Sequence, residues 1–311
     1  MKNFKGYFIT VIAALCWGFS GTMGEYLLHE KHLDPNWVTA VRMLGAGVIL
    51  MMYILLKNGI TDTQKELLRD RSSIIQLVLY GVLGLAANQL TYLQAIQYSN
   101  SGTATVLQYS GTVLLVIVVC AMAPRLPFKT EVIAVALALL GTFLLATHGN
   151  INQLVLTQEA LIWGMLSAVA TVTNTLLPIP LVKKYGSSLT IVYGLLVGGL
   201  FLSLIFSIWN IPVQLDFETI LALFGMIVVG TIFAYNMFLI GVNIIGSIKA
   251  SLIACLEPVA AIVFSMLFLG TSFVAMDFIG SATIVSAAAI VSIVDLILEK
   301  KKDNEELSAR V

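Results

Sequence analysis

The chain has 311 residues, of which 59% are hydrophobic and only 11% are charged. Soluble globular domains carry about 25% charged residues, so this composition argues against a water-soluble protein of this size. The 17 basic and 17 acidic residues balance to a net charge of zero, which argues against nucleic acid as a partner.

Ten apolar blocks follow one another along the chain. Each has about 20 residues, the length at which a helix crosses a ~30 Å hydrocarbon core. The sequence therefore predicts an all-α polytopic membrane protein in a lipid bilayer. In chain order, the predicted membrane-spanning helices cover residues 6–28, 37–56, 73–97, 103–122, 130–148, 158–180, 188–209, 218–242, 247–270 and 274–297. Residues 57–72 are predicted to be a solvated loop, and residues 299–311 a charged cytoplasmic tail.

Lysine and arginine residues are distributed unevenly between the two ends of these helices. When successive connections are assigned to alternate sides, 14 of these residues share the side of the amino terminus, and only Lys31 lies on the other. Arg42 and Lys249 fall inside predicted helices and are not counted. Because positive charge is retained in the cytoplasm, this asymmetry predicts a multi-pass protein of the cytoplasmic membrane with both termini in the cytoplasm.

Weak internal similarity relates the two halves of the chain. Trp17-Gly18 in the first block recurs as Trp163-Gly164 in the sixth, an offset of 146 residues. The same offset aligns Ala95 with Gly241, Ser101 with Ser247, Ala104 with Ala250, and Glu131 with Asp277. The second and seventh blocks align only at an offset of 151, which indicates a local insertion.

Each half contains five predicted helices, and an odd number makes the second half enter the membrane from the opposite side. We therefore predict two inverted five-helix repeats, residues 1–149 and 150–298. Secondary transporters are built in this way, with the binding site near the middle of the membrane where the halves meet.

The pair Glu257-Pro258 lies near the middle of the ninth block. Proline has no backbone N–H, so Pro258 leaves the carbonyl of Ala254 unpaired and predicts a kink. A carboxyl group beside a free carbonyl makes a polar position deep in the membrane. Glu257 is interpreted either as a substrate or proton site, or as a structural hydrogen-bonding residue.

Other polar and aromatic side chains within the blocks are candidates for a central cavity, because such groups rarely face lipid. The predicted substrate-binding or cavity residues are Trp17, Asn88, Tyr92, Gln108, Trp163, Asn174, Tyr235, Asn236, Lys249 and Glu257. The alternatives are interhelical hydrogen bonds for the uncharged residues, core packing for the tryptophans, and contact of Lys249 with lipid headgroups.

Glu25 and Arg42 lie near the outer ends of the first two blocks. We expect them to form a structural ion pair, with direct contact between Arg42 and substrate as the alternative.

Enzyme motifs are absent from the sequence, which contains no HExxH, GxSxG or P-loop pattern. We therefore expect no catalytic residues, no metal and no cofactor. A membrane enzyme or a receptor scaffold is the less favoured class, since neither a reactive cluster nor a soluble sensing domain is found.

These features resemble the EamA type of the drug/metabolite transporter superfamily, from Trp17 to about Asp295. The resemblance is carried by the two Trp-Gly pairs, Arg42 in VRMLG, Gly102-Thr103-Ala104, and KASLIACLEPV at Lys249 to Val259. In one departure, the first half has Gly111-Thr112 where the second has Glu257-Pro258, so only one half supplies the kink and the carboxyl group.

The resemblance implies a ten-helix carrier with a central cavity that exports amino acids or other small metabolites. Efflux of amphiphilic or cationic compounds is the alternative. We expect alternating access, a small-molecule substrate and no nucleic acid, with protons as a candidate coupling ion. The sequence gives no indication of an oligomeric partner.

Overall fold

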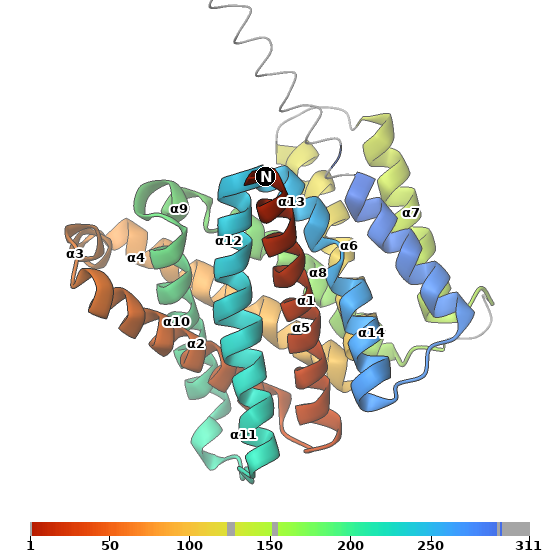
Figure 1. Ribbon diagram of the computed structural model, residues 1–311, viewed down its shortest axis with the longest axis horizontal. Helices are drawn as coiled ribbons and strands as arrows, with labels where there is room; N and C mark the ends of the chain where they lie inside the picture. The colour runs from red at the N-terminus through yellow and green to blue at the C-terminus, as the bar shows by residue number, and fades with distance from the viewer. Residues whose placement is uncertain (1, 123–127, 151–154, 291–292, 294–311) are drawn as a thin grey trace, which may run out of the picture.

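The computed structural model describes residues 2–122, 128–150, 155–290 and 293, and these residues form an all-α bundle (Figure 1). Within these ranges, nine continuous or interrupted helices are long and apolar enough to cross a membrane, and Ala275–Ile290 is a shorter apolar helix. The predicted all-α membrane architecture is confirmed, with Ala275–Ile290 as the tenth helix. Residues 291–297 at the end of the last predicted block lie largely outside the described residues.

The elements have the following bounds. They are α1 Lys2–His29, α2 Pro35–Asn58, α3 Asp62–Arg69, α4 Arg71–Leu79, η1 Tyr80–Ala86, α5 Ala87–Gln97, α6 Ser101–Met122, α7 Lys129–Thr147, α8 Gln158–Leu176, α9 Ile179–Tyr185, α10 Ser187–Phe206, η2 Ile208–Asn210, α11 Phe217–Phe224, η3 Gly225–Phe233, α12 Ala234–Ile245, α13 Ser247–Ala254 and α14 Glu257–Leu269.

The segment predicted to be a loop, residues 57–72, contains the short helix α3. Thr61 caps this helix, and its side chain and that of Gln64 form a reciprocal capping box. Leu67 is fully buried and anchors α3 to the bundle. The prediction missed the helix because one buried leucine among charged neighbours carries little hydropathy signal.

In the described part of the chain, two membrane-spanning helices contain a π-helical segment. The third consists of α4, η1 and α5, and the eighth consists of α11, η3 and α12. Shifting η1 by 146 residues gives residues 226–232, which lie inside η3. The two halves of the chain therefore carry the same irregularity at matching positions.

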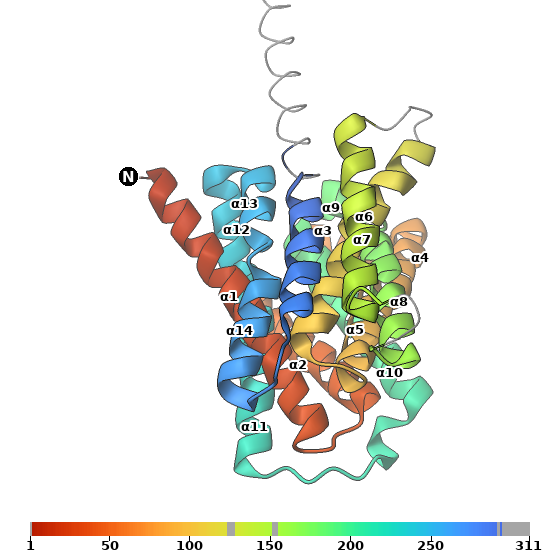
Figure 2. The same cartoon turned by 90° about the vertical axis from the view of Figure 1, so that its right-hand side faces the viewer.

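Alternate ends of the helices form two faces of the bundle. The beginnings of α1 and α13 lie on one face, which we call the amino-terminal face, and α11 begins on the opposite face (Figure 2). On the opposite face, Lys31 pairs with Asp216 at 2.7 Å, and His148 lies 2.9 Å from Asp277. The lysine holds the pKa of the Asp216 carboxyl below its usual range. These contacts join segments that are distant in sequence and hold this face together.

Candidate functional site

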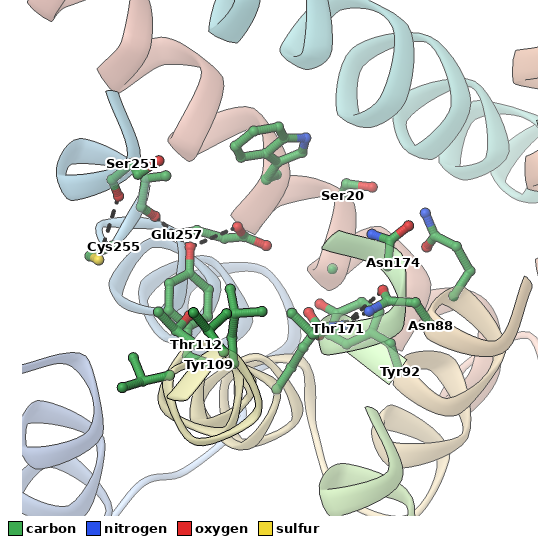
Figure 3. Close-up of a pocket in the computed structure, with 18 of the residues that line it drawn as sticks. Ser20, Asn88, Tyr92, Tyr109, Thr112, Thr171, Asn174, Ser251, Cys255 and Glu257 are labelled. Carbon is green, nitrogen blue, oxygen red and sulfur yellow. Dashed lines mark hydrogen bonds between the residues drawn. The ribbon is translucent and has the colours of Figure 1, made fainter. Parts of the chain in front are cut away.

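A cavity of about 530 Å³ lies in the centre of the bundle (Figure 3). Its lining residues come from both halves of the chain. They are Trp17, Ser20, Gly21, Arg42, Asn88, Gln89, Tyr92, Gln108, Tyr109, Thr112, Leu115, Val116, Val119, Glu131, Thr171, Asn174, Ser251, Ala254, Cys255 and Glu257. Because Val119, Glu131 and Ser251 lie near the ends of their helices on the amino-terminal face, the cavity extends from the middle of the bundle toward that face.

A second cavity of about 380 Å³ adjoins the first and is lined largely by α2, η1, α8, α10 and η3. We call the two cavities the first and second lobes. The residues shared by both lobes are Trp17, Arg42, Gln89 and Asn174. We call these four residues the waist.

Arg42 is buried, with 7% of its surface exposed, and it lines both lobes. Its Nε donates to the hydroxyl of Thr231 at 3.2 Å. The Thr231 hydroxyl in turn donates to the carbonyl of Met226, five residues earlier in η3. Among the described residues, no carboxylate lies within 4 Å of the guanidinium, and its two terminal nitrogens make no hydrogen bond. A buried guanidinium with no carboxylate in direct contact is costly, so this group is suited to bind an anion from the cavity.

The predicted Glu25–Arg42 ion pair is wrong. The Glu25 carboxylate is 2% exposed and accepts a hydrogen bond from the backbone N–H of Ser101 at 2.9 Å. The hydroxyls of Ser265 and Thr271 also donate to it, each at 2.9 Å. Glu25 therefore caps the start of α6 and holds it beside the end of α14, which satisfies its charge without Arg42.

Glu257 begins α14 after a break in the ninth helix at Cys255–Leu256. The Tyr109 hydroxyl lies 2.7 Å from the carbonyl oxygen of Ala254 and 3.1 Å from Oε2 of Glu257 (Figure 3). Instead of the predicted kink in a continuous helix, the structure shows two helices joined by a turn, with Tyr109 satisfying the freed carbonyl. The first half has no equivalent break, because α6 is continuous through Gly111 and Thr112.

The remaining polar residues of the first lobe form a short hydrogen-bonded chain. The amide of Gln108 donates to Asn88 at 3.2 Å, and the amide of Asn88 donates to Thr171 at 2.9 Å. The amide of Asn174 makes no hydrogen bond among the described residues, and its Oδ1 is buried. The waist thus contains an amide that is available to a ligand.

The structure places six of the ten predicted cavity residues in the lining of the first lobe. These are Trp17, Asn88, Tyr92, Gln108, Asn174 and Glu257. Tyr235 lines the second lobe instead.

Trp163, Asn236 and Lys249 were predicted to line the cavity but do not. Trp163 packs against the hydrophobic core around Leu27, and the amide of Asn236 donates to its own helix from an exposed position. Lys249 is half-buried on α13 and lines neither lobe.

Tyr109 and Gln89 were not among the predicted candidates. Tyr109 was identifiable from the chemistry of Pro258, since a carbonyl freed in the membrane needs a donor on a neighbouring helix. Gln89 follows Asn88 directly, so a regular helix would turn it about 100° away from the candidate face.

Comparison with known proteins identifies the family. The profile of the EamA-like transporter family matches residues 4–147 and again residues 158–293. The chain belongs to the EamA-like transporter family. It is 32% identical over 289 residues to a Salmonella typhimurium protein named "Uncharacterized inner membrane transporter YicL", covering 93% of this chain and 95% of that relative. A solved structure titled "Crystal structure of protein" shares the fold with a TM-score of 0.61 and 16% identity, covering 93% of this chain and 96% of the other.

Membership of the EamA-like family shows what class of protein this is. The chain is a multi-pass membrane transporter of a small molecule rather than an enzyme. The two lobes and their waist are the candidate site for that molecule, and their chemistry bears on its class.

Proposed function

We propose that the protein is a secondary transporter that exports small metabolites bearing a carboxylate, such as amino acids, by alternating access. The observation that carries this proposal is the guanidinium of Arg42, which is buried, faces both lobes and has no carboxylate partner among the described residues. A substrate carboxylate can accept two parallel hydrogen bonds from its terminal nitrogens. The same charge disfavours cationic compounds, the alternative substrate class.

Glu257 is proposed to carry a proton in exchange for substrate. The Tyr109 hydroxyl has one hydrogen, which it can donate either to the Ala254 carbonyl or to Glu257. When Glu257 is protonated, it can donate to the Tyr109 oxygen while Tyr109 donates to Ala254, so that every polar group in this cluster is satisfied. When Glu257 is ionised, Tyr109 can serve only one of the two acceptors.

The halves of the chain are proposed to be inverted repeats, residues 1–149 and 150–298. The paired π-helical segments and the two matches to the family profile support this proposal. The amino-terminal face is proposed to be cytoplasmic, because 14 of the lysine and arginine residues fall on that side in the sequence. The cavity then faces the cytoplasm, as an exporter requires when it loads substrate.

The proposed orientation can be tested with a reporter enzyme fused after Val311. A reporter that is active only outside the cytoplasm is expected to be silent in this position. A reporter that is active only in the cytoplasm is expected to be active there and serves as the control. Activity of the first reporter contradicts the orientation and the direction of loading.

The proposed substrate class can be tested by thermal unfolding of the purified protein with a panel of metabolites. A ligand that binds only the folded state adds about 2.7 kcal/mol of stability at a hundredfold excess over its Kd. Amino acids are expected to raise the Tm, whereas the matching amines without a carboxylate are not. A panel in which the amines alone raise the Tm contradicts the proposal.

A further inference from the structure

The second lobe differs in chemistry from the first. The apolar side chains that line it are Leu50, Leu85, Pro178, Val182, Ile191 and Leu195. Tyr80 and Tyr235 add two aromatic rings, and among the described residues the only charged one in this lining is Arg42 at the waist. In contrast, the first lobe contains Glu131 and Glu257 and the amide groups of Asn88 and Gln108.

The waist joins this apolar lobe to polar groups that have unused hydrogen-bond donors or acceptors. Arg42 has free donors on its two terminal nitrogens, and Asn174 has an amide without a hydrogen bond. Gln89 and the indole N–H of Trp17 also make no hydrogen bond among the described residues. A carboxylate and an ammonium group bound here would find donors on Arg42 and an amide acceptor on Asn174.

We infer that the second lobe is a side-chain subsite, which makes α-amino acids with large apolar side chains the preferred substrates. The inference rests on the proposed function, because it takes the carboxylate to be bound by Arg42. The amino acid head group lies at the waist, and its side chain extends between η1 and α10.

Volume and charge both support this assignment. The second lobe, at about 380 Å³, falls within the range of about 300–1,000 Å³ typical of small-molecule sites. Beyond the waist, its described lining contains no acidic or basic residue, so the charged side chain of aspartate or lysine would be buried without a counter-charge. Glycine and alanine leave the lobe unfilled and gain little from burial.

The first experiment measures binding of glycine, alanine, leucine, phenylalanine, aspartate and lysine to the purified full-length protein. Each buried methylene strengthens binding several-fold, so leucine and phenylalanine are expected to bind at least about tenfold more tightly than glycine. Aspartate and lysine are expected to bind no better than glycine. Equal binding of all six, or a preference for a charged side chain, overturns the subsite.

The second experiment fills the lobe with a larger side chain. Ile191 is half-buried on α10 and lines the second lobe, so Ile191→Trp is expected to lower the preference for leucine over glycine by about tenfold. Leu204→Trp is the matched control, because Leu204 lies on the same helix and is 60% exposed on the outside of the bundle. An unchanged preference in Ile191→Trp overturns the subsite, and the side-chain series on the unmodified protein decides the question if this variant does not fold.

The two experiments separate this inference from the proposed function. If glycine and leucine bind equally and both require Arg42, the subsite is wrong while the carboxylate carrier stands. If none of the six amino acids binds, the proposed amino acid substrate fails together with its subsite. If a lipid acyl chain occupies the second lobe instead, glycine and leucine are expected to bind equally, with both still requiring Arg42.

Discussion

Replacing Arg42 with glutamine is expected to weaken substrate binding by roughly a hundredfold, equivalent to about 3 kcal/mol. The guanidinium is buried at the waist with one hydrogen bond to Thr231 and no carboxylate partner in the described structure. Glutamine removes the charge and one of the two donors that face a bound carboxylate. The loss can be measured as the Kd for an amino acid identified in the thermal panel.

Two further variants make the Arg42 result specific. Arg42→Lys keeps the charge but lacks the planar pair of donors, so its affinity is expected to fall between those of the unmodified protein and Arg42→Gln. Lys249→Gln is the matched control, because Lys249 is a cation at the start of the ninth membrane-spanning helix and lines neither lobe. If the affinity is unchanged in Arg42→Gln but lost in Lys249→Gln, the substrate carboxylate does not bind at Arg42.

Replacing Glu257 with glutamine is expected to abolish the pH dependence of transport while substrate binding remains measurable. Exchange of one proton for substrate gives a dependence of up to about tenfold per pH unit in the unmodified protein. Glutamine keeps the shape and an acceptor for the Tyr109 hydroxyl, but it cannot release a proton. Transport in reconstituted vesicles at a series of external pH values measures the difference.

Glu25→Gln is the matched control for this prediction. Glu25 is also a buried carboxyl group within the bundle, but it bonds to Ser101, Ser265 and Thr271 and does not line either lobe. Its variant is therefore expected to retain the pH dependence. If Glu257→Gln retains the full pH profile, Glu257 is a structural hydrogen-bonding residue and the proton is carried elsewhere.

Hydropathy predicted the number and order of the helices because it reports where the chain lies along the membrane normal. It did not predict α3, whose only fully buried apolar residue is Leu67. It also did not predict that the ninth helix separates into α13 and α14, since proline alone does not distinguish a kink from a break.

The candidate site was predicted only in part, because residue spacing does not give the rotation of a helix within a bundle. Glu25 and Arg42 lie at suitable depths for a pair, yet Glu25 turns toward Ser101 and Arg42 turns toward Thr231. Because the ion pair between Glu25 and Arg42 does not form, the Arg42 guanidinium lines the cavity without a bound carboxylate among the described residues. Tyr109 was missed because Pro258 predicts a free carbonyl at Ala254 but does not say which neighbouring helix supplies its donor.

The π-helical segment η1 changes the helical phase of the third membrane-spanning helix. A π-helical turn closes its hydrogen bonds over five residues instead of four, so side chains after Ala86 point in directions that a regular α-helix would not give them. A helical wheel drawn through Arg71–Gln97 at 100° per residue therefore misplaces one end of the helix relative to the other. Tyr80, at the start of the segment, lines the apolar lobe, and Tyr92, beyond its end, lines the polar one.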